Sequence, residues 1–196
     1  MTAARAVCVF CGSQAGARPA YLQAARELGS RLARRGWSVV YGGGHVGMMG
    51  ALADSTLAAG GKVIGVIPEH LMRPEVAHQA LTELLIVDSM HTRKRVMASR
   101  SDAFIVLPGG FGTFEEMFEM VTWRQLQLHA KPVGLVNVEG YFDQLLAFLQ
   151  HAFEQEFIRP QHRGLLAVEA GVQTLLEQLD RQLATAPAAV GDLERS

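Results

Sequence analysis

Short apolar runs alternate with amphipathic segments along almost the whole chain. Apolar runs of strand length predict strands over residues 6–10, 37–41, 62–67, 84–87, 103–107, 132–136 and 165–168. Apolar residues at helical spacing predict helices over 19–35, 51–59, 90–101 and 141–157, and in segments ending at 128 and 183. Such alternation is typical of a parallel sheet with crossover helices on both faces. We therefore expect one α/β domain over residues 1–183, with a doubly wound, mainly parallel sheet, and a disordered Ala/Pro tail over 184–196.

Composition agrees with a single globular domain and excludes several classes of protein. The 196 residues are 49% hydrophobic and 19% charged, which is ordinary for a folded domain. A formal net charge of -1 gives no support for a nucleic-acid surface. No apolar run reaches the roughly 18 residues of a membrane span, and the N-terminus does not resemble a secretory signal. We expect no membrane partner and a cytoplasmic location.

The cysteines and histidines do not predict a metal or redox site. Cys8 and Cys11 form a C-x-x-C pattern, but strand alternation sends their side chains to opposite faces. Buried free thiols are the better interpretation. The seven histidines show neither H-x-x-x-H spacing nor a His/Cys pairing, so no metal is expected.

The chemistry of the chain is expected around the glycine-rich segment 108–116. It follows an apolar strand and opens a helix, so its backbone N–H groups and the helix dipole favour a bound phosphate. Glu115 and Glu116 come directly after the glycines. Glycine-bearing turns at Gly12, at 42–47 and at 109–112 all follow strands, and ligands of parallel sheets bind at such strand ends.

Each of these motifs also has a purely structural interpretation. Gly42-x-Gly44-x-x-Gly47 matches a dinucleotide fingerprint only as a string, because it follows the second strand. A general phosphate- or backbone-approach loop explains it better than a nicotinamide site, and tight packing of helix on sheet is the structural alternative. Thr113 and Glu116 have capping-box spacing, and Glu115 and Glu119 could complement the helix dipole.

Other candidate residues are equally ambiguous on composition alone. The basic run 93–95 is either a solvated helix face or an anion site. Glu75, His45 and His91 have the composition of loop or helix-start residues. The helix after the glycines has more apolar residues than one core-facing stripe needs, which indicates either deep burial or, as we prefer, an isologous homodimer.

Two motifs taken together resemble a known family. They are Met90-His91-x-Arg93-Lys94 and Pro108-Gly109-Gly110-x-Gly112-Thr113-x-x-Glu116, and both are present without a departure. This pair resembles the signature of the LOG ("Lonely Guy") proteins, which are cytokinin riboside 5′-monophosphate phosphoribohydrolases often mislabelled as lysine decarboxylases. The resemblance covers roughly residues 5 to 180, including the segments 10–13 and 41–44.

The resemblance implies a Rossmann-like fold, usually dimeric, and hydrolysis of the N-glycosidic bond of a nucleoside 5′-monophosphate without a cofactor. It implies that Arg93 and Glu116 are the catalytic pair. The implied nucleotide contacts are Glu75, Arg93, Lys94, Gly110, Phe111, Gly112, Thr113, Phe114, Glu115, Glu116 and Thr122. Gly12, Ser13, Gly43 and Gly44 are expected to shape the rest of the pocket.

These residue types suit the implied reaction. A carboxylate at Glu116 can stabilise the oxocarbenium character that develops as a ribosyl C–N bond breaks. Thr113 and the amides of 110–112 can hold the 5′-phosphate at the helix N-terminus. Arg93 keeps its proton far above neutral pH, so electrostatic work on the phosphate or the departing base suits it better than acid catalysis.

Two rival functions and the choice of base remain open at this point. Lysine decarboxylation would need pyridoxal phosphate on a lysine, and neither Lys62, Lys94 nor Lys131 has that setting. A non-catalytic carrier, as in the molybdenum-cofactor carriers of the same superfamily, could use the same cradle. Prenylated adenine nucleotides would need an apolar groove, expected near Met48, Met90 or Phe111, whereas AMP would not.

Overall fold

The structure is a computed structural model that describes residues 5–72 and 77–185. Its strands form one seven-stranded sheet in the order β4-β3-β2-β1-β5-β6-β7, and every neighbouring pair is parallel. The strands are β1 (Ala6–Phe10), β2 (Ser38–Tyr41), β3 (Val63–Pro68), β4 (Glu83–Val87), β5 (Ala103–Val106), β6 (Val133–Val136) and β7 (Leu166–Glu169). The predicted doubly wound α/β fold is confirmed, and the sheet is wholly parallel.

Helices connect the strands and cover both faces of the sheet. They are α1 (Pro19–Arg34), α2 (Gly47–Ala58), α3 (Met90–Ser99), α4 (Phe111–Gln125), α5 (Asp143–Glu154) and α6 (Val172–Thr185). The described part of the chain also forms the short 3₁₀ helices η1 (Glu69–Leu71), η2 (Val138–Gly140) and η3 (Pro160–Leu165). Among the residues described, no helix is long and apolar enough to cross a membrane.

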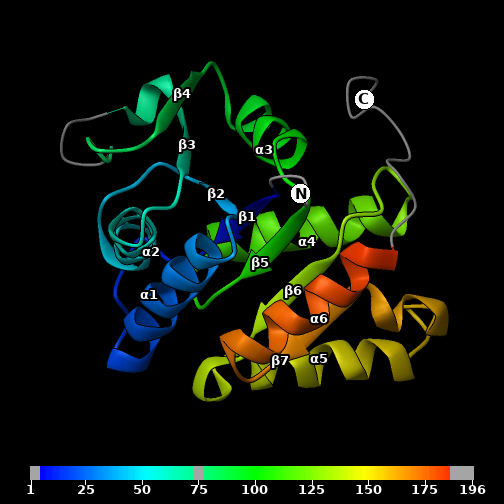
Figure 1. The fold of residues 1–196 in the computed structure, drawn as a ribbon. Coiled ribbons are helices and arrows are strands. Elements are labelled where there is room, and N and C mark those ends of the chain that lie inside the picture. The colour runs from blue at the N-terminus through cyan, green and yellow to red at the C-terminus, as the bar shows by residue number, and fades with distance from the viewer. Residues whose placement is uncertain (1–4, 73–76, 186–196) are drawn as a thin grey trace.

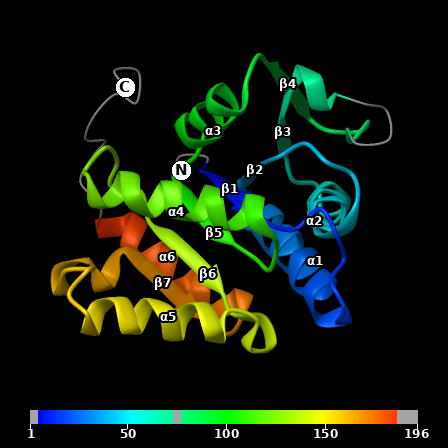
Figure 2. The same ribbon diagram turned by 180° about the vertical axis from the view of Figure 1, so that it is seen from behind.

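The hydrophobic core lies in two layers, one on each side of the sheet. Side chains of α1, α2 and α6 pack on one face, and those of α3, α4 and α5 pack on the other. Figure 1 looks onto α1 and α6, and Figure 2 looks from behind onto α4 and α5. Cys8 belongs to the second layer and Cys11 to the first, and both are buried free thiols, as the strand pattern predicted.

Several helix ends differ from the prediction for identifiable reasons. Gln127 adopts a left-handed φ of 61° just after α4, which ends before Leu128, and Glu156 with φ 63° likewise follows the end of α5. α2 begins at Gly47, four residues before the predicted start, so Gly50 lies inside the helix and not in the preceding turn. A Cβ at Gly50 would lie 2.0 Å from the His45 carbonyl oxygen. α6 continues to Thr185, so most of the predicted tail lies outside the described residues.

The order of the strands determines where a ligand can bind. From β1 the chain first builds outward through β2, β3 and β4, and then crosses to the other side of β1 for β5, β6 and β7. The loops after β1 and β5 therefore leave their strands in opposite directions. A crevice opens between such loops at the carboxyl ends of the strands.

Candidate active site

A cleft of about 380 Å³ lies at this crossover point, above the carboxyl ends of β1, β2 and β3. The loop after β1 contributes Gly12 and Ser13, and the loop after β2 contributes Gly42 and Gly44. The start of α4 contributes residues 110–113 and Glu116, and α3 contributes Arg93. The three glycine-bearing turns and both residues of the expected catalytic pair thus meet in one cleft.

The glycines of these turns allow the loops to contact each other closely. The Gly12 N–H donates to the Pro108 carbonyl at 3.0 Å, which joins the loops after β1 and β5. A Cβ at Gly109 would lie 2.1 Å from Thr113 Oγ1 and 2.8 Å from the Gly12 nitrogen. At Gly47, which has φ 60°, a Cβ would lie 2.3 Å from the Ser13 carbonyl oxygen. The backbone packing explains why larger residues do not fit there.

The N-terminus of α4 directs its first amides into the cleft. Gly110 is the N-cap residue and Phe111 the first helical residue. The first N–H groups of a helix have no partner within it, and the helix dipole adds partial positive charge there. Thr113, whose side chain is buried, stands in this first turn. The predicted capping box is wrong, because the helix starts two residues before Thr113 and Glu116 falls in the second turn.

Arg93 and Glu116 form an ion pair in the lining of the cleft. Arg93 Nη1 lies 3.3 Å from Glu116 Oε1, and both side chains are largely buried. Arg93 Nε donates to the Val66 carbonyl at 3.1 Å, which fixes the guanidinium against the end of β3. A Cβ at Gly42 would lie 2.2 Å from Arg93 Nη2, so the arginine rests directly on a glycine.

Burial controls the charge of Glu116. Its removal from water raises the pKa of Glu116 to about 7, and the Arg93 guanidinium, which lowers the pKa, offsets only part of this effect. A carboxyl with a pKa near neutrality exchanges a proton readily at physiological pH. Cys11 also lines the cleft, but burial raises the pKa of its thiol well above the ordinary value, so the thiol stays protonated.

The structure places Lys94 and Glu115 outside the cleft. The Lys94 ammonium is buried between α3 and α4, where it donates to Glu115 and lies 3.1 Å from Glu119 Oε2. Neither Lys94 nor Glu115 is among the described residues that line the cleft. Glu115 and Glu119 therefore belong to an ion-pair cluster between two helices. The sequence suggested complementation of the helix dipole for both residues, and the family resemblance implied a nucleotide contact for Glu115.

The remaining expected contacts divide between the cleft, the core and other surfaces. Phe111 stands at the rim of the cleft and is 92% exposed. Gly43, with φ 78°, lies behind the cleft wall next to Ile67, and Phe114 packs edge-to-face against Phe142. Thr122 lines a separate apolar groove between α4 and α5. Glu75 lies outside the described residues.

Two contributions to the site were not found from sequence. Met49, Ile67 and Leu71 form an apolar wall of the cleft, whereas Met48, which we expected near a prenyl group, is buried in the core. The position of Ile67 at the end of β3 was the available signal for this wall. The Tyr141 hydroxyl donates to the Gly109 carbonyl at 2.6 Å, and it supports the glycine turn from a distant part of the chain.

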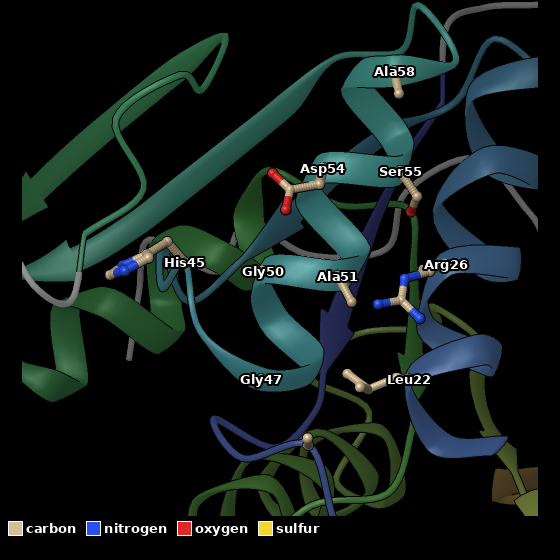
Figure 3. A pocket seen from close by; sticks show the side chains of 10 residues that line it. Leu22, Arg26, His45, Gly47, Gly50, Ala51, Asp54, Ser55 and Ala58 are labelled. Atoms are coloured by element: carbon tan, nitrogen blue, oxygen red, sulfur yellow. The ribbon is translucent and has the colours of Figure 1, made fainter. Parts of the chain in front are cut away.

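A second hollow of about 480 Å³ borders α2 and the adjoining side of α1, but its polar groups do not converge. Figure 3 shows His45 and Asp54 on one side of α2, pointing away from Arg26, which lies on the other side. Asp54 Oδ1 lies 3.0 Å from His78 Nε2, an interaction that holds the chain after residue 76. No single ligand of ordinary size would engage both sides of this helix.

The site residues do not suggest a metal or an aldimine-forming lysine. Among the residues described, no three His, Cys, Asp or Glu side chains are grouped so that they could hold a metal ion. The described residues that line the cleft include none of the three lysines. Lys62 is exposed, Lys94 is held by carboxylates, and Lys131 donates to the Ala98 carbonyl at 2.7 Å.

Comparison with known proteins supports an assignment to one family. A family model described as "Possible lysine decarboxylase" matches residues 49–179. A rice protein, "Probable cytokinin riboside 5′-monophosphate phosphoribohydrolase LOGL9" (Oryza sativa subsp. japonica), is 51% identical over 176 residues, which are 90% of this chain and 78% of the rice protein. "Cytokinin riboside 5′-monophosphate phosphoribohydrolase LOG1" of Arabidopsis thaliana is 47% identical over 174 residues, 89% of this chain and 82% of that protein.

Solved structures of lower sequence identity share the fold. The molybdenum cofactor carrier protein from Chlamydomonas reinhardtii superimposes with a TM-score of 0.71 at 23% identity, over 93% of this chain and 99% of the carrier. The molybdenum cofactor binding protein from Rippkaea orientalis gives 0.70 at 22% identity, over 92% and 98% of the two chains. At these identities the likeness shows a common fold and no more.

Proposed function

This chain belongs to the LOG family of phosphoribohydrolases, and we propose that it hydrolyses the N-glycosidic bond of cytokinin riboside 5′-monophosphates. The products are the free base and ribose 5-phosphate. The family relationship makes the chain an enzyme that acts on a nucleoside monophosphate. AMP is proposed as a second substrate, since it has the same ribose phosphate and the same adenine ring.

One observation carries the proposal. The cleft combines an anion-binding helix N-terminus with an opposed arginine and carboxylate, Arg93 and Glu116, 3.3 Å apart. The amides of residues 110–113 suit a 5′-phosphate, because the first amides of a helix lack partners within it and carry the positive end of its dipole. A phosphate held there leaves the ribose beside Glu116, in the second turn of the same helix.

The reaction follows from these positions. The C1′–N bond breaks, its electron pair leaves with the base, and positive charge develops on the ribose ring. The Glu116 carboxylate stabilises that charge, and a water molecule then adds to C1′ and gives up one proton. The departing base takes up one proton, so the products are ribose 5-phosphate and the neutral base. Arg93, fixed by Val66, stabilises the negative charge that develops on the departing base. Since the cleft wall is apolar and Glu116 is buried, these charges interact through a medium of low polarity.

The apolar wall formed by Met49, Ile67 and Leu71 supports a prenylated base. A prenyl side chain on the adenine would cover this wall and remove it from water. The carrier alternative receives no comparable support, because a binder for an anionic ligand has no use for a carboxylate facing the ligand. Decarboxylation would need a lysine in the cleft, and all three lysines lie elsewhere.

We also propose a homodimer that covers the groove between α4 and α5. The groove measures about 310 Å³ and is lined by apolar side chains, among them Phe118, Val121 and Leu149. Thr122 opens into this groove, about 15 Å along α4 from the glycine turn at 1.5 Å per residue. If Thr122 contacts the nucleotide, as the family resemblance implies, it reaches the cleft of the other protomer.

The direct test is product release. The purified protein is incubated with isopentenyladenosine 5′-monophosphate and, separately, with AMP, without added cofactor, and free base and ribose 5-phosphate are measured. We expect release from both, faster from the prenylated nucleotide because of the apolar wall. Binding of either nucleotide without release of base would contradict the proposal and favour the carrier.

A further inference from the structure

The Lys94 side chain is buried away from the cleft, although it directly follows Arg93. Only 7% of its side-chain surface is exposed. Its ammonium donates to Glu115 and makes a charge contact of 3.1 Å with Glu119 Oε2. Both carboxylates belong to α4, so Lys94 joins α3 to the helix that carries Glu116.

The two ion-pair sets lie side by side between α3 and α4. Consecutive helical residues point about 100° apart, so Arg93 and Lys94 approach α4 in different directions. Arg93 meets Glu116, while Lys94 meets Glu115 and Glu119, which are four residues apart and therefore share a face of α4. A rotation or slide of α3 that moved Arg93 off Glu116 would also break the Lys94 contacts.

The charges of Glu115 and Glu119 stabilise the Lys94 ammonium in its buried position. Burial lowers the pKa of Lys94, but the hydrogen bonds and charges of Glu115 and Glu119 more than offset this, and the pKa is raised. Glu115 and Glu119 also raise the pKa of Glu116, and Lys94 lowers it. Lys94 thus neutralises two carboxylates that would otherwise disfavour the ionised form of Glu116.

We infer that Lys94 is a positioning residue, which holds α3 against α4 so that Arg93 reaches Glu116, and that it does not contact the nucleotide phosphate. This inference rests on the proposed function. It differs from the role that the family signature implies for Lys94. To reach a phosphate at the α4 N-terminus, the ammonium would have to leave two carboxylates and a buried position. The phosphate is held instead by the amides of residues 110–113.

The test separates catalysis from phosphate binding. Lys94→Met, Glu119→Gln and the double variant are compared by kcat with the prenylated nucleotide and by the Kd for ribose 5-phosphate, measured by calorimetry. We expect each single variant to lower kcat about tenfold, because Arg93 is displaced, with Kd within about twofold of wild type. The double variant should be no slower than the worse single variant, since both residues act through one contact. Lys94→Arg should recover part of kcat.

Several results would overturn the inference. A Kd for ribose 5-phosphate weakened about tenfold or more in Lys94→Met, but not in Glu119→Gln, would make Lys94 a phosphate ligand. Wild-type kcat in both single variants would remove the positioning role. Arg95→Met, which changes an exposed cation on the same helix, is the matched control and should leave kcat and Kd unchanged.

The outcome does not depend on every variant folding, nor on the proposed reaction. Circular dichroism melting checks the fold of each variant. If Lys94→Met does not fold, Glu119→Gln alone decides between a lowered and an unchanged kcat. If the wild-type protein releases no base from any nucleotide, the proposed function fails, and the Kd for ribose 5-phosphate in Lys94→Met still decides whether Lys94 contacts phosphate.

Discussion

The Glu116 side chain is buried and forms an ion pair with Arg93, so its role in the reaction can be tested directly. Its carboxyl is buried, faces Arg93 at 3.3 Å and does not cap α4. We therefore expect Glu116→Gln to lower kcat by about 10² to 10³, as for loss of an electrostatic stabiliser, without loss of the α4 start. The measurement is kcat alongside the thermal midpoint. Arg95→Ala, at an exposed position two residues after Arg93, should keep full activity. An active Glu116→Gln enzyme would contradict the assigned role.

The raised pKa of Glu116 predicts how stability depends on pH. The carboxyl has a pKa near 4.5 when unfolded and about 7 when folded, mainly because of burial. The folded state therefore binds the proton more tightly, and this stabilisation is complete below pH 4.5 and lost as the pH rises through 7. The shift corresponds to at most about 3 kcal/mol. Urea unfolding from about pH 4.5 to about pH 8.5 should show this loss for wild type relative to Glu116→Gln. Parallel curves would mean that Glu116 is ionised throughout.

Among the secondary-structure elements, the loop after β2 leaves space at Gly42 for the Arg93 guanidinium of α3. Gly42 lies under the Arg93 guanidinium, and a Cβ there would come within 2.2 Å of Nη2. Gly42→Ala should displace Arg93 and lower kcat at least about tenfold, whereas the melting temperature falls by only a few degrees. Gly164→Ala, where an added Cβ meets nothing within 4 Å, is the control. Equal kcat values for these two variants would show that the arginine tolerates the shift.

The sequence predicted the strands and the meeting of the glycine turns, but not the start of α4 or the partners of Lys94. The strands and their parallel arrangement followed from apolar runs, because such runs depend mainly on burial along the local chain. The meeting of Gly12, Gly44 and Gly110 followed from the rule that parallel strands end at one edge. The start of α4 and the partners of Lys94 did not follow. The partners of Lys94 depend on how the consecutive helices α3 and α4 are rotated against each other, which residue spacing on either helix does not determine. The start of α4 follows a glycine turn that is held by contacts with the distant residues Gly12 and Tyr141.

At the scale of the whole molecule, the described surface keeps apolar side chains exposed on the side of α4 and α5. Phe118, whose exposed fraction is 38%, lines the groove with Val121 and Thr122, and Phe148 lies exposed on another face of α5. A groove of this kind would be costly to leave in water and is suited to a self-complementary contact. Phe118 and Val121 are thus two of the apolar residues of α4 that a single core-facing stripe does not require.

The proposed homodimer makes a prediction that links assembly to activity. Phe118→Asp places a charge in the groove and should convert a dimer to a monomer in sedimentation analysis, because a buried carboxylate without a partner is strongly disfavoured. If Thr122 of each protomer serves the other cleft, kcat/KM should fall at the same time, and the fall should be larger at lower protein concentration. Phe148→Asp is the control, since Phe148 is not among the described residues that line the groove. A monomeric wild type, or a monomeric Phe118→Asp protein with full activity, would separate the groove from the reaction and leave each cleft complete within one protomer.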